Sequence, residues 1–185
     1  GLIKGSELAT RQKNVLEHFS RYLGHSPKID ERIYESERKT AHRNRSIAHL
    51  LRHFNVLEHD IDDTLDIYFK QCSILVSTLD LATMAGTLAN RGRSPFTQAV
   101  ALEKEYVGDM LSLMFTCGMY DSSGEWAYSV GIPAKSGVSG AIFGVVPGQM
   151  GIAVYSPPID EKGHSVRGLK VFKHLSQELG LSSLR

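Results

Sequence analysis

The chain has 185 residues, of which 42% are hydrophobic and 22% are charged, a composition that fits one folded domain and excludes a disordered chain. Its 21 Lys and Arg residues nearly balance 20 Asp and Glu residues, which gives a formal net charge of +1. This balance gives no electrostatic reason to expect nucleic acid or a membrane surface as a partner. No apolar run approaches the roughly 18 residues that a membrane span needs.

The cysteine content and the first residues lead to two further expectations. Cys72 and Cys117 are the only cysteines, too few for a disulfide scaffold or a zinc site, which predicts a cytoplasmic protein. The sequence opens with Gly1-Leu2-Ile3-Lys4, without an initiator Met. We therefore expect the chain to be a portion of a longer protein.

Apolar side chains recur at helical spacing through residues 1–122, which predicts a helical region whose apolar stripes face a core. Ser77 followed by Asp80 predicts the start of one of these helices, and Asn90 with the glycine beyond it marks its end. The stripes, in chain order, consist of Val15, Leu16, Phe19 and Leu23; Ile47, Leu50, Leu51 and Phe54; Ile61, Leu65, Tyr68, Phe69 and Cys72; Leu81, Met84, Ala85 and Leu88; and Val107, Met110, Leu111 and Met114.

The pattern changes in residues 123–185, where strands and a closing helix are predicted. Large and small residues alternate over 126–130, as they do in a strand. Two further strands are predicted at 141–146 and 151–155, and the short Gly/Pro turns between the strands favour antiparallel hairpins. The closing helix carries Leu169, Phe172, Leu175 and Leu179 on one side. We therefore expect a single α+β domain, and so thin a sheet predicts further strands beside it.

The most unusual stretch of the sequence is Pro133-Ala134-Lys135-Ser136-Gly137-Val138-Ser139-Gly140. A Lys-Ser/Thr-Gly triplet beside a strand is one sequence box of the serine acyl-transferases that include β-lactamases and penicillin-binding proteins. Its glycine lets a substrate approach the backbone, and an N–H group beyond it can point at a developing oxyanion. The alternative interpretation is a glycine-rich hairpin with a surface lysine, which the triplet taken alone favours.

The same acyl-transferases also need a Ser-x-x-Lys helix start, in which a base activates the serine. One match is present, Ser36-Glu37-Arg38-Lys39. In those enzymes strands precede the serine, whereas no strand is predicted before Ser36. We therefore favour the alternative, in which Ser36 is a helix N-cap and Lys39 is solvated.

Other polar residues carry weaker signals when each is taken alone. Glu37 and Asn44 are seven residues apart, so one face of a helix could carry both, although polar residues at that spacing usually face solvent. Tyr68 lies in an apolar stripe, as a core tyrosine with its hydroxyl at the edge would. Tyr120 lies where a helix gives way to a turn.

The histidines predict neither a metal site nor another cofactor site. His49 and His53 are four residues apart, with His42 nearby, but no HExxH pattern or third ligand accompanies them. We expect them to be surface histidines, and no phosphate-binding glycine loop is recognised.

Several short motifs, taken in order, resemble one enzyme family. The motifs are Ser36-Glu37-Arg38 with Arg43-Asn44, Asp66-Ile67-Tyr68-Phe69, Leu88-Ala89-Asn90, Cys117-Gly118-Met119-Tyr120, Pro133-Ala134-Lys135-Ser136-Gly137-Val138 and Ser156-Pro157-Pro158. In this order and spacing they resemble the serine-dependent glutaminases, which hydrolyse L-glutamine to L-glutamate and ammonia. The resemblance covers essentially the whole chain and corresponds to the carboxy-terminal three-fifths of such an enzyme. It implies a β-lactamase/transpeptidase-like α+β fold that lacks its amino-terminal strands, and a Ser-x-x-Lys nucleophile upstream of Gly1.

The resemblance also implies roles for five residues. Glu37 and Asn44 would bind the substrate, as would Tyr68 of the Asp-x-Tyr-Phe motif. Tyr120 would bind the substrate and help proton transfer, for which neighbours must lower its pKa from about 10. The backbone N–H of Val138 would contact the substrate and donate to the oxyanion. These groups suit glutamine, which presents an ammonium, a carboxylate and an amide.

Two functions are compatible with these residues. The first is a glutaminase that acts through a serine acyl-enzyme, without a cofactor, as a cytoplasmic homo-oligomer (dimer or tetramer) when complete; the 185-residue chain alone is then expected to be inactive. The second is a non-catalytic fragment or pseudoenzyme that keeps part of the glutamine-binding surface. A β-lactamase or penicillin-binding protein fits less well, because those enzymes carry the Lys-Ser/Thr-Gly triplet without the accompanying motifs.

Overall fold

The computed structural model describes residues 3–184, which form two compact units. The helical unit comprises residues 3–20 and His25–Leu75, and the sheet unit comprises Arg21–Gly24 and residues 76–184. Each unit buries apolar side chains of its own: one cluster lies in the helical unit and two lie in the sheet unit. Each unit therefore has its own core.

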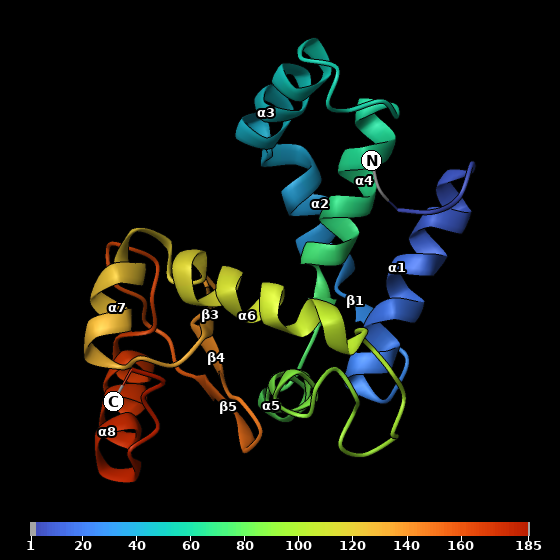
Figure 1. Cartoon of the computed structure of the whole chain (residues 1–185). Helices are drawn as coiled ribbons and strands as arrows, with labels where there is room; N and C mark the ends of the chain where they lie inside the picture. Colours follow the sequence, from blue (N-terminus) through green and yellow to red (C-terminus); the bar gives the residue numbers. More distant parts are fainter. Residues whose placement is uncertain (1–2, 185) are drawn as a thin grey trace. The chain divides into compact units, whose positions relative to one another are not determined.

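The helical unit consists of helices and one two-stranded antiparallel pair (Figure 1). Its elements are α1 (Leu8–Leu23), which belongs to this unit as far as residue 20, β1 (Lys28–Ile29), α2 (Glu31–Thr40), α3 (His42–His53), α4 (Ile61–Cys72) and β2 (Ile74–Leu75). Tyr34 of α2 and Leu65 and Phe69 of α4 are buried in its core. The capping side chain of Asp60 starts α4 by accepting a hydrogen bond from the backbone N–H of Asp63.

Ser36 does not cap its helix, so that interpretation is wrong. The helix α2 already begins at Glu31, because the side chain of Asp30 accepts hydrogen bonds from the backbone N–H groups of Arg32 and Ile33 at 2.9 and 3.2 Å. An aspartate in this position satisfies the first free amides of a helix as well as a serine does. Ser36 therefore lies inside the helix.

The apolar stripe predicted for α3 is not part of the core. Ile47, Leu50, Leu51 and Phe54 are 39–66% exposed, whereas Ala48 is 5% exposed. The helix packs through this small side chain, and its larger apolar side chains lie on the surface of the chain. The periodicity predicted the helix correctly and the buried face incorrectly.

The sheet unit combines a three-stranded antiparallel sheet with helices. Its elements are α5 (Thr78–Ala89), α6 (Lys104–Cys117), the 3-10 helix η1 (Tyr120–Ser122), α7 (Ser123–Ser129), β3 (Ala134–Gly137), β4 (Ala141–Val146), β5 (Met150–Tyr155) and α8 (Val166–Leu179). The strand order is β3-β4-β5, which confirms the predicted antiparallel hairpin of 141–146 with 151–155, whereas the partner on the other side of β4 is β3 rather than the predicted strand at 126–130. The predicted capping box of Ser77 and Asp80 is also confirmed, and α5 ends with Asn90 as its C-cap.

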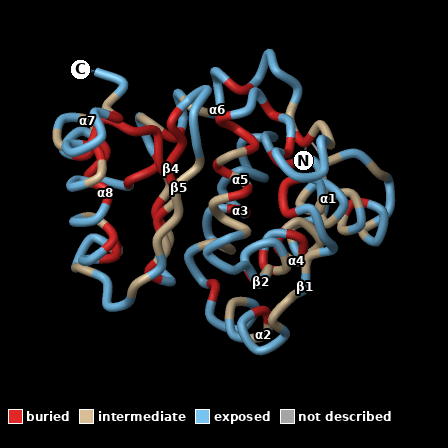
Figure 2. The backbone as a smooth tube through the Cα atoms, turned by 90° about the horizontal axis from the view of Figure 1, so that it is seen from below, coloured by how far each residue is buried: buried red, intermediate tan, exposed pale blue. Residues whose placement is uncertain are grey.

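Helices cover both faces of this sheet (Figure 2). Val145 of β4 packs in a cluster with residues of α5. Val145 pairs with Gly151 of β5. A Cβ atom at Gly151 would lie only 2.2 Å from the backbone nitrogen of Gly86 in α5. On the opposite face, a Cβ atom at Gly144 would lie 2.7 Å from the ring of Phe172 in α8. Glycine at these two positions therefore lets both helices approach the sheet closely.

The strand predicted at 126–130 is wrong. These residues form the end of α7 and its C-cap, and the first strand of the sheet is β3. Trp126 is buried, and its indole N–H donates to the carbonyl oxygen of Ile132 at 2.7 Å, whereas Tyr128 is 80% exposed. The apolar residues that are buried here, Trp126 and Val130, are four apart, as on one face of a helix, rather than two apart as in a strand.

Candidate active site

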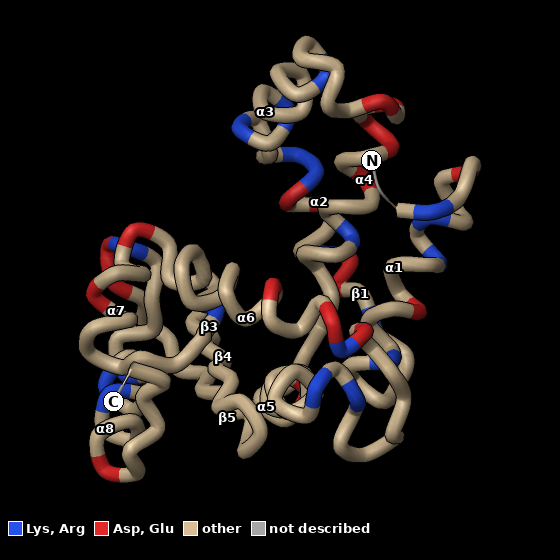
Figure 3. Tube along the Cα trace, in the orientation of Figure 1, with Lys and Arg blue, Asp and Glu red and all other residues tan. Residues whose placement is uncertain are grey.

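The Lys-Ser-Gly triplet lies on β3, an edge strand of the sheet. Ser136 is 1% exposed, and its backbone N–H donates to the carbonyl oxygen of Gly118, just after α6, at 3.0 Å. Lys135 is the single charged residue in the three strands (Figure 3), and its ammonium donates to the carbonyl oxygen of Ser136. It is half-buried rather than a surface lysine, and burial lowers its pKa.

Tyr120 is held beside this strand in an uncommon backbone conformation. Its φ is 46°, in the left-handed region that bulky residues seldom occupy. Its hydroxyl donates to the carbonyl oxygen of Ser136 at 3.0 Å, and Nζ of Lys135 lies 4.4 Å from the centroid of its ring. Burial raises the pKa of Tyr120 above its ordinary value of 10.0, so its phenol is protonated at neutral pH. The lowered pKa that proton shuttling would require is therefore not found.

Val138 is the first residue of the turn between β3 and β4. The N–H of Gly140 closes this turn by donating to the carbonyl oxygen of Gly137 at 3.0 Å, and Gly140 takes a φ of 96° that favours glycine. Val138 is 70% exposed, and its backbone N–H makes no hydrogen bond with any residue in 3–184.

The structure brings Val138 and Tyr120 together around one glycine. A Cβ atom at Gly163 would lie 3.4 Å from Cγ1 of Val138 and 3.8 Å from Cε2 of Tyr120. The Val138 side chain and the Tyr120 ring therefore both lie next to Gly163 within the sheet unit.

Glu37, Asn44 and Tyr68 come together in the helical unit, one from each of α2, α3 and α4. The pKa of Tyr68 is raised chiefly by a hydrogen bond with Cys72. The negative charge of the Cys72 thiolate and burial raise it further. A hydrogen bond with Asn44 lowers this pKa, and the negative charge of Glu37 raises it. The carboxylate and the amide therefore both lie near the Tyr68 hydroxyl, although Glu37 and Asn44 occupy consecutive helices rather than one helix face.

Tyr68 opens on a cavity rather than lying in the core. It is 44% exposed, so the expectation of a core tyrosine is wrong. Together with Asn44 it lines a cavity of about 590 Å³ in the helical unit, and the apolar side chains of Ile47, Leu51 and Val56 line the same cavity.

Asp66 ties together the helices that carry these residues. Its carboxylate accepts hydrogen bonds from Gln12 of α1 at 2.5 Å and from the hydroxyl of Tyr34 of α2, and it pairs with Lys70 at 3.0 Å. Because Asp66 is two residues from Tyr68 on α4, these bonds fix α2 and α4 relative to each other inside the helical unit. The predicted residues thus form two groups: Glu37, Asn44 and Tyr68 in the helical unit, and Tyr120 and Val138 in the sheet unit.

One residue of the sheet unit was missed by the sequence analysis. His164 is 1% exposed, its Nδ1 lies 2.9 Å from Oγ of Ser136, and its ring stacks on that of Tyr120 with 5.4 Å between centroids. Nothing in the local sequence distinguishes it from the other histidines, because its burial depends on the fold of the loop before α8.

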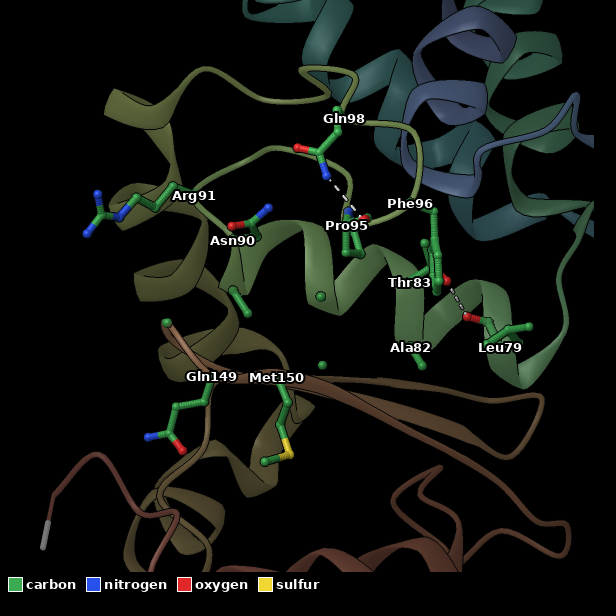
Figure 4. A pocket seen from close by; sticks show the side chains of 14 residues that line it. Leu79, Ala82, Thr83, Asn90, Arg91, Pro95, Phe96, Gln98, Gln149 and Met150 are labelled. Carbon is green, nitrogen blue, oxygen red and sulfur yellow. Dashed lines mark hydrogen bonds between the residues drawn. The ribbon is translucent and has the colours of Figure 1, made fainter.

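A second cavity, which lies in the sheet unit, contains none of the predicted residues. It has a volume of about 690 Å³ and lies between α5, the loop after it and the β4–β5 turn (Figure 4). The amide of Gln98 donates to the carbonyl oxygen of Pro95 at 3.2 Å. The hydroxyl of Thr83 donates to the carbonyl oxygen of Leu79 at 2.8 Å. Figure 4 shows Arg91 pointing away from the cavity.

Two further kinds of site are not found within residues 3–184. No three His, Cys, Asp or Glu side chains there are grouped closely enough to hold a metal ion, and His42, His49 and His53 all lie on α3. None of the helices in this range has the length and apolarity needed to cross a bilayer.

The sequence is similar to proteins called glutaminases. The sequence model of the glutaminase family matches residues 1–184. A glutaminase of Trichormus variabilis is 55% identical over 180 residues, which are 97% of this chain and 54% of that protein. A glutaminase of Clostridium tetani is 44% identical over 98% of this chain and 60% of its own length. The chain therefore spans only about half of the Trichormus relative.

Solved structures agree with the sequence comparison. The probable glutaminase ybaS has a TM-score of 0.96 and 40% identity, covering 100% of this chain and 60% of its own. The Bacillus subtilis glutaminase YbgJ, solved as its covalent complex with 5-oxo-L-norleucine, has a TM-score of 0.94 and 38% identity, covering 98% of this chain and 65% of its own. These neighbours have a β-lactamase-like fold, which confirms the predicted α+β fold class. On its sequence and its structure, this chain belongs to the glutaminase family.

Proposed function

We propose that this chain is part of an enzyme that hydrolyses L-glutamine to L-glutamate and ammonia through an acyl-serine intermediate. The oxygen of a serine outside these 185 residues attacks the side-chain amide carbon, the C–N bond breaks, and the nitrogen leaves as ammonia after gaining a proton. Water then cleaves the ester, which releases glutamate and restores the serine hydroxyl. The covalent complex that YbgJ forms with 6-diazo-5-oxo-L-norleucine supports a covalent route.

The observation that carries this proposal is the grouping of Tyr120, Lys135 and the free amide of Val138 beside β3. The Val138 N–H can donate to the oxyanion of the tetrahedral intermediate, an interaction that contributes about 3–4 kcal/mol in serine hydrolases. Because burial raises the pKa of Tyr120, its phenol stays protonated, so it is suited to donate a hydrogen bond to the departing nitrogen, a role that needs no lowered pKa.

The helical unit supplies the groups for recognition of a free amino acid. Glu37 provides an anion for the α-ammonium group, and Asn44 and the hydroxyl of Tyr68 provide neutral polar partners for the carboxylate or the amide. Such a site rejects ligands that leave these polar groups unpaired. A non-catalytic glutamine-binding protein would keep these same groups, so activity must decide between the two functions.

Location and assembly are part of the same proposal. The thiols of Cys72 and Cys117 are free, as in a protein of the cytoplasm. The exposed apolar side chains of α3 support a homo-oligomer, a dimer or a tetramer, because exposed apolar patches often mark interfaces. Light scattering on the complete protein would measure its mass directly.

Ammonia release from glutamine by the complete protein tests the proposed function, with Tyr120→Phe as the decisive variant. We expect kcat to fall by about 100-fold or more, as for the loss of one hydrogen-bond donor to the transition state, while KM changes little. Tyr128→Phe removes a hydroxyl from an 80% exposed ring in the same unit and should leave both constants unchanged. A complete protein that binds glutamine and releases no ammonia would establish the non-catalytic alternative.

A further inference from the structure

His164 is buried at the point where the Lys-Ser-Gly strand meets Tyr120. Its backbone is fixed by Asp160, whose side chain accepts a hydrogen bond from the His164 N–H at 2.8 Å and whose own N–H donates to the carbonyl oxygen of His164 at the same distance. The next residue, Ser165, caps α8 by accepting from the N–H of Gly168. The histidine is therefore held from both sides along the chain.

The imidazole contacts two residues of the candidate site at once. Its Nδ1 lies 2.9 Å from Oγ of Ser136, and its ring stacks on that of Tyr120 at an interplanar angle of 22°. The hydroxyl of Tyr120 in turn donates to the carbonyl oxygen of Ser136. These three residues form a closed set of contacts, so displacing the imidazole would remove one support of both the strand and the phenol.

The surroundings keep this imidazole neutral. Burial is the largest cause that lowers the pKa of His164, and the positive charges of Lys162 and Lys135 lower it further. The carboxylates of Asp160 and Glu125 act in the opposite direction and are outweighed. The remaining titratable neighbour, Tyr120, is uncharged at neutral pH, as argued above.

The free nitrogen of the ring indicates which tautomer is present. Nε2 of His164 is buried and has no hydrogen-bond partner among residues 3–184. A buried N–H without an acceptor is rarer in proteins than a buried acceptor without a donor. This favours the tautomer with its proton on Nδ1, which donates to Oγ of Ser136 and leaves Nε2 as an acceptor.

We propose that His164 is a positioning residue that locks Ser136 and the ring of Tyr120, so that the Tyr120 hydroxyl and the Val138 amide keep the geometry that amide hydrolysis needs. Its importance for the reaction rests on the proposed function. Its contacts to Ser136 and Tyr120 do not, and they can be tested independently.

Two variants separate the two contacts of the imidazole. His164→Phe keeps an aromatic ring against Tyr120 and removes the hydrogen bond to Ser136, so kcat of the complete protein should fall about 10- to 100-fold, as for a catalytic group displaced by about 1 Å. In His164→Asn the amide nitrogen can still donate to Ser136 but the ring that stacks on Tyr120 is lost, so kcat should fall by less than in His164→Phe, with KM unchanged in both variants. His174→Asn, an exposed position on α8, is the matched control. Wild-type kcat in His164→Phe would overturn the proposal.

A spectroscopic measurement keeps the proposal testable if His164→Phe fails to fold or the complete protein proves inactive. Nitrogen-15 NMR of the imidazoles in the 185-residue chain should show one histidine that stays neutral, with its proton on Nδ1, below about pH 6.5, the ordinary pKa of histidine. That signal should be absent from His164→Asn. A His164 that becomes charged at the ordinary histidine pKa, or carries its proton on Nε2, would overturn the positioning role, whereas inactivity alone would count only against the proposed function.

Discussion

At the scale of single residues, Tyr120 has a strained backbone conformation that the side chain of Ser123 holds in place. A tyrosine at a φ of 46° costs about 1–3 kcal/mol, and such strain persists where the surroundings fix it. Here the hydroxyl of Ser123 donates to the carbonyl oxygen of Tyr120 at 3.0 Å and accepts from the N–H of Met119 at 3.2 Å. The strained turn is therefore braced on both sides of Tyr120, which keeps the phenol beside β3.

Glu37 allows a direct test of substrate recognition. Glu37→Gln removes the negative charge and keeps the size of the side chain, so KM for glutamine should rise. A hydrogen bond to a charged group contributes about 1.5–3 kcal/mol, which corresponds to about 10- to 100-fold in KM. Steady-state kinetics of the complete protein measure this change, and kcat should fall less.

A neighbouring glutamate on the same helix is the matched control. Glu35 pairs with Arg38 and Lys39 on the surface at 3.9 and 4.0 Å, and such exposed pairs contribute at most about 1 kcal/mol to stability. Glu35→Gln should therefore leave KM unchanged. If Glu37→Gln lowers the melting temperature and leaves KM at the wild-type value, Glu37 is structural rather than a substrate contact.

At the scale of elements, the close contact between α5 and β5 gives a prediction about stability. A Cβ atom at Gly151 would lie 2.2 Å from the backbone nitrogen of Gly86 and 2.4 Å from the carbonyl oxygen of Ala82. Neither is the end of a flexible side chain, so Gly151→Ala must push the helix off the sheet. We expect a loss of about 1–3 kcal/mol in the free energy of unfolding, measured by urea denaturation.

A second glycine separates this steric effect from the general effect of adding a methyl group. Gly108 lies inside α6, and a Cβ atom there would meet nothing within 4 Å. Gly108→Ala should therefore stabilise the protein by about 0.5–1 kcal/mol, because alanine is the better helix residue. Equal effects of the two substitutions would contradict the argument for close packing at Gly151.

Local sequence signals predicted elements wherever a short-range interaction decides the structure. The capping box at Ser77 depends only on residues three apart, and the β4–β5 hairpin depends on a short turn, so both could be predicted. Whether Trp126 lies in a helix or a strand depends on its packing against Phe172, which no local pattern contains. The exposure of α3 likewise depends on tertiary packing, since periodicity identifies an apolar face without showing what covers it.

Some residues of the candidate site could be proposed from the sequence, and one could not. Glu37, Asn44, Tyr68, Tyr120 and Val138 could be named only because their motifs resemble a known family. His164 could not be identified, because its contacts with Ser136 and Tyr120 join residues that are 28 and 44 positions apart in the chain. Such contacts exist only once the sheet unit has folded.

At the scale of the whole molecule, the Ser-x-x-Lys match of the chain lacks the geometry of a nucleophile and its base. Ser36 lies inside α2, where its carbonyl oxygen accepts a hydrogen bond from Thr40 at 2.8 Å. Nζ of Lys39 lies 4.0 Å from the carboxylate of Glu35 on the exposed side of the helix, and no hydrogen bond joins it to Ser36 among residues 3–184. These residues therefore offer no activated serine at this position.

The 185-residue chain by itself should therefore release no ammonia from glutamine above the background of a buffer control. An oxyanion donor and binding groups without a nucleophile retain about 10³- to 10⁴-fold acceleration over water in serine hydrolases, far below a working enzyme. The chain should also gain no mass with 6-diazo-5-oxo-L-norleucine, and a longer polypeptide that includes the preceding part of the gene should gain both activities. If the chain alone released ammonia and Ser36→Ala abolished that release, Ser36 would be the nucleophile, and the assignment of Glu37 to substrate binding on the same helix turn would have to be abandoned.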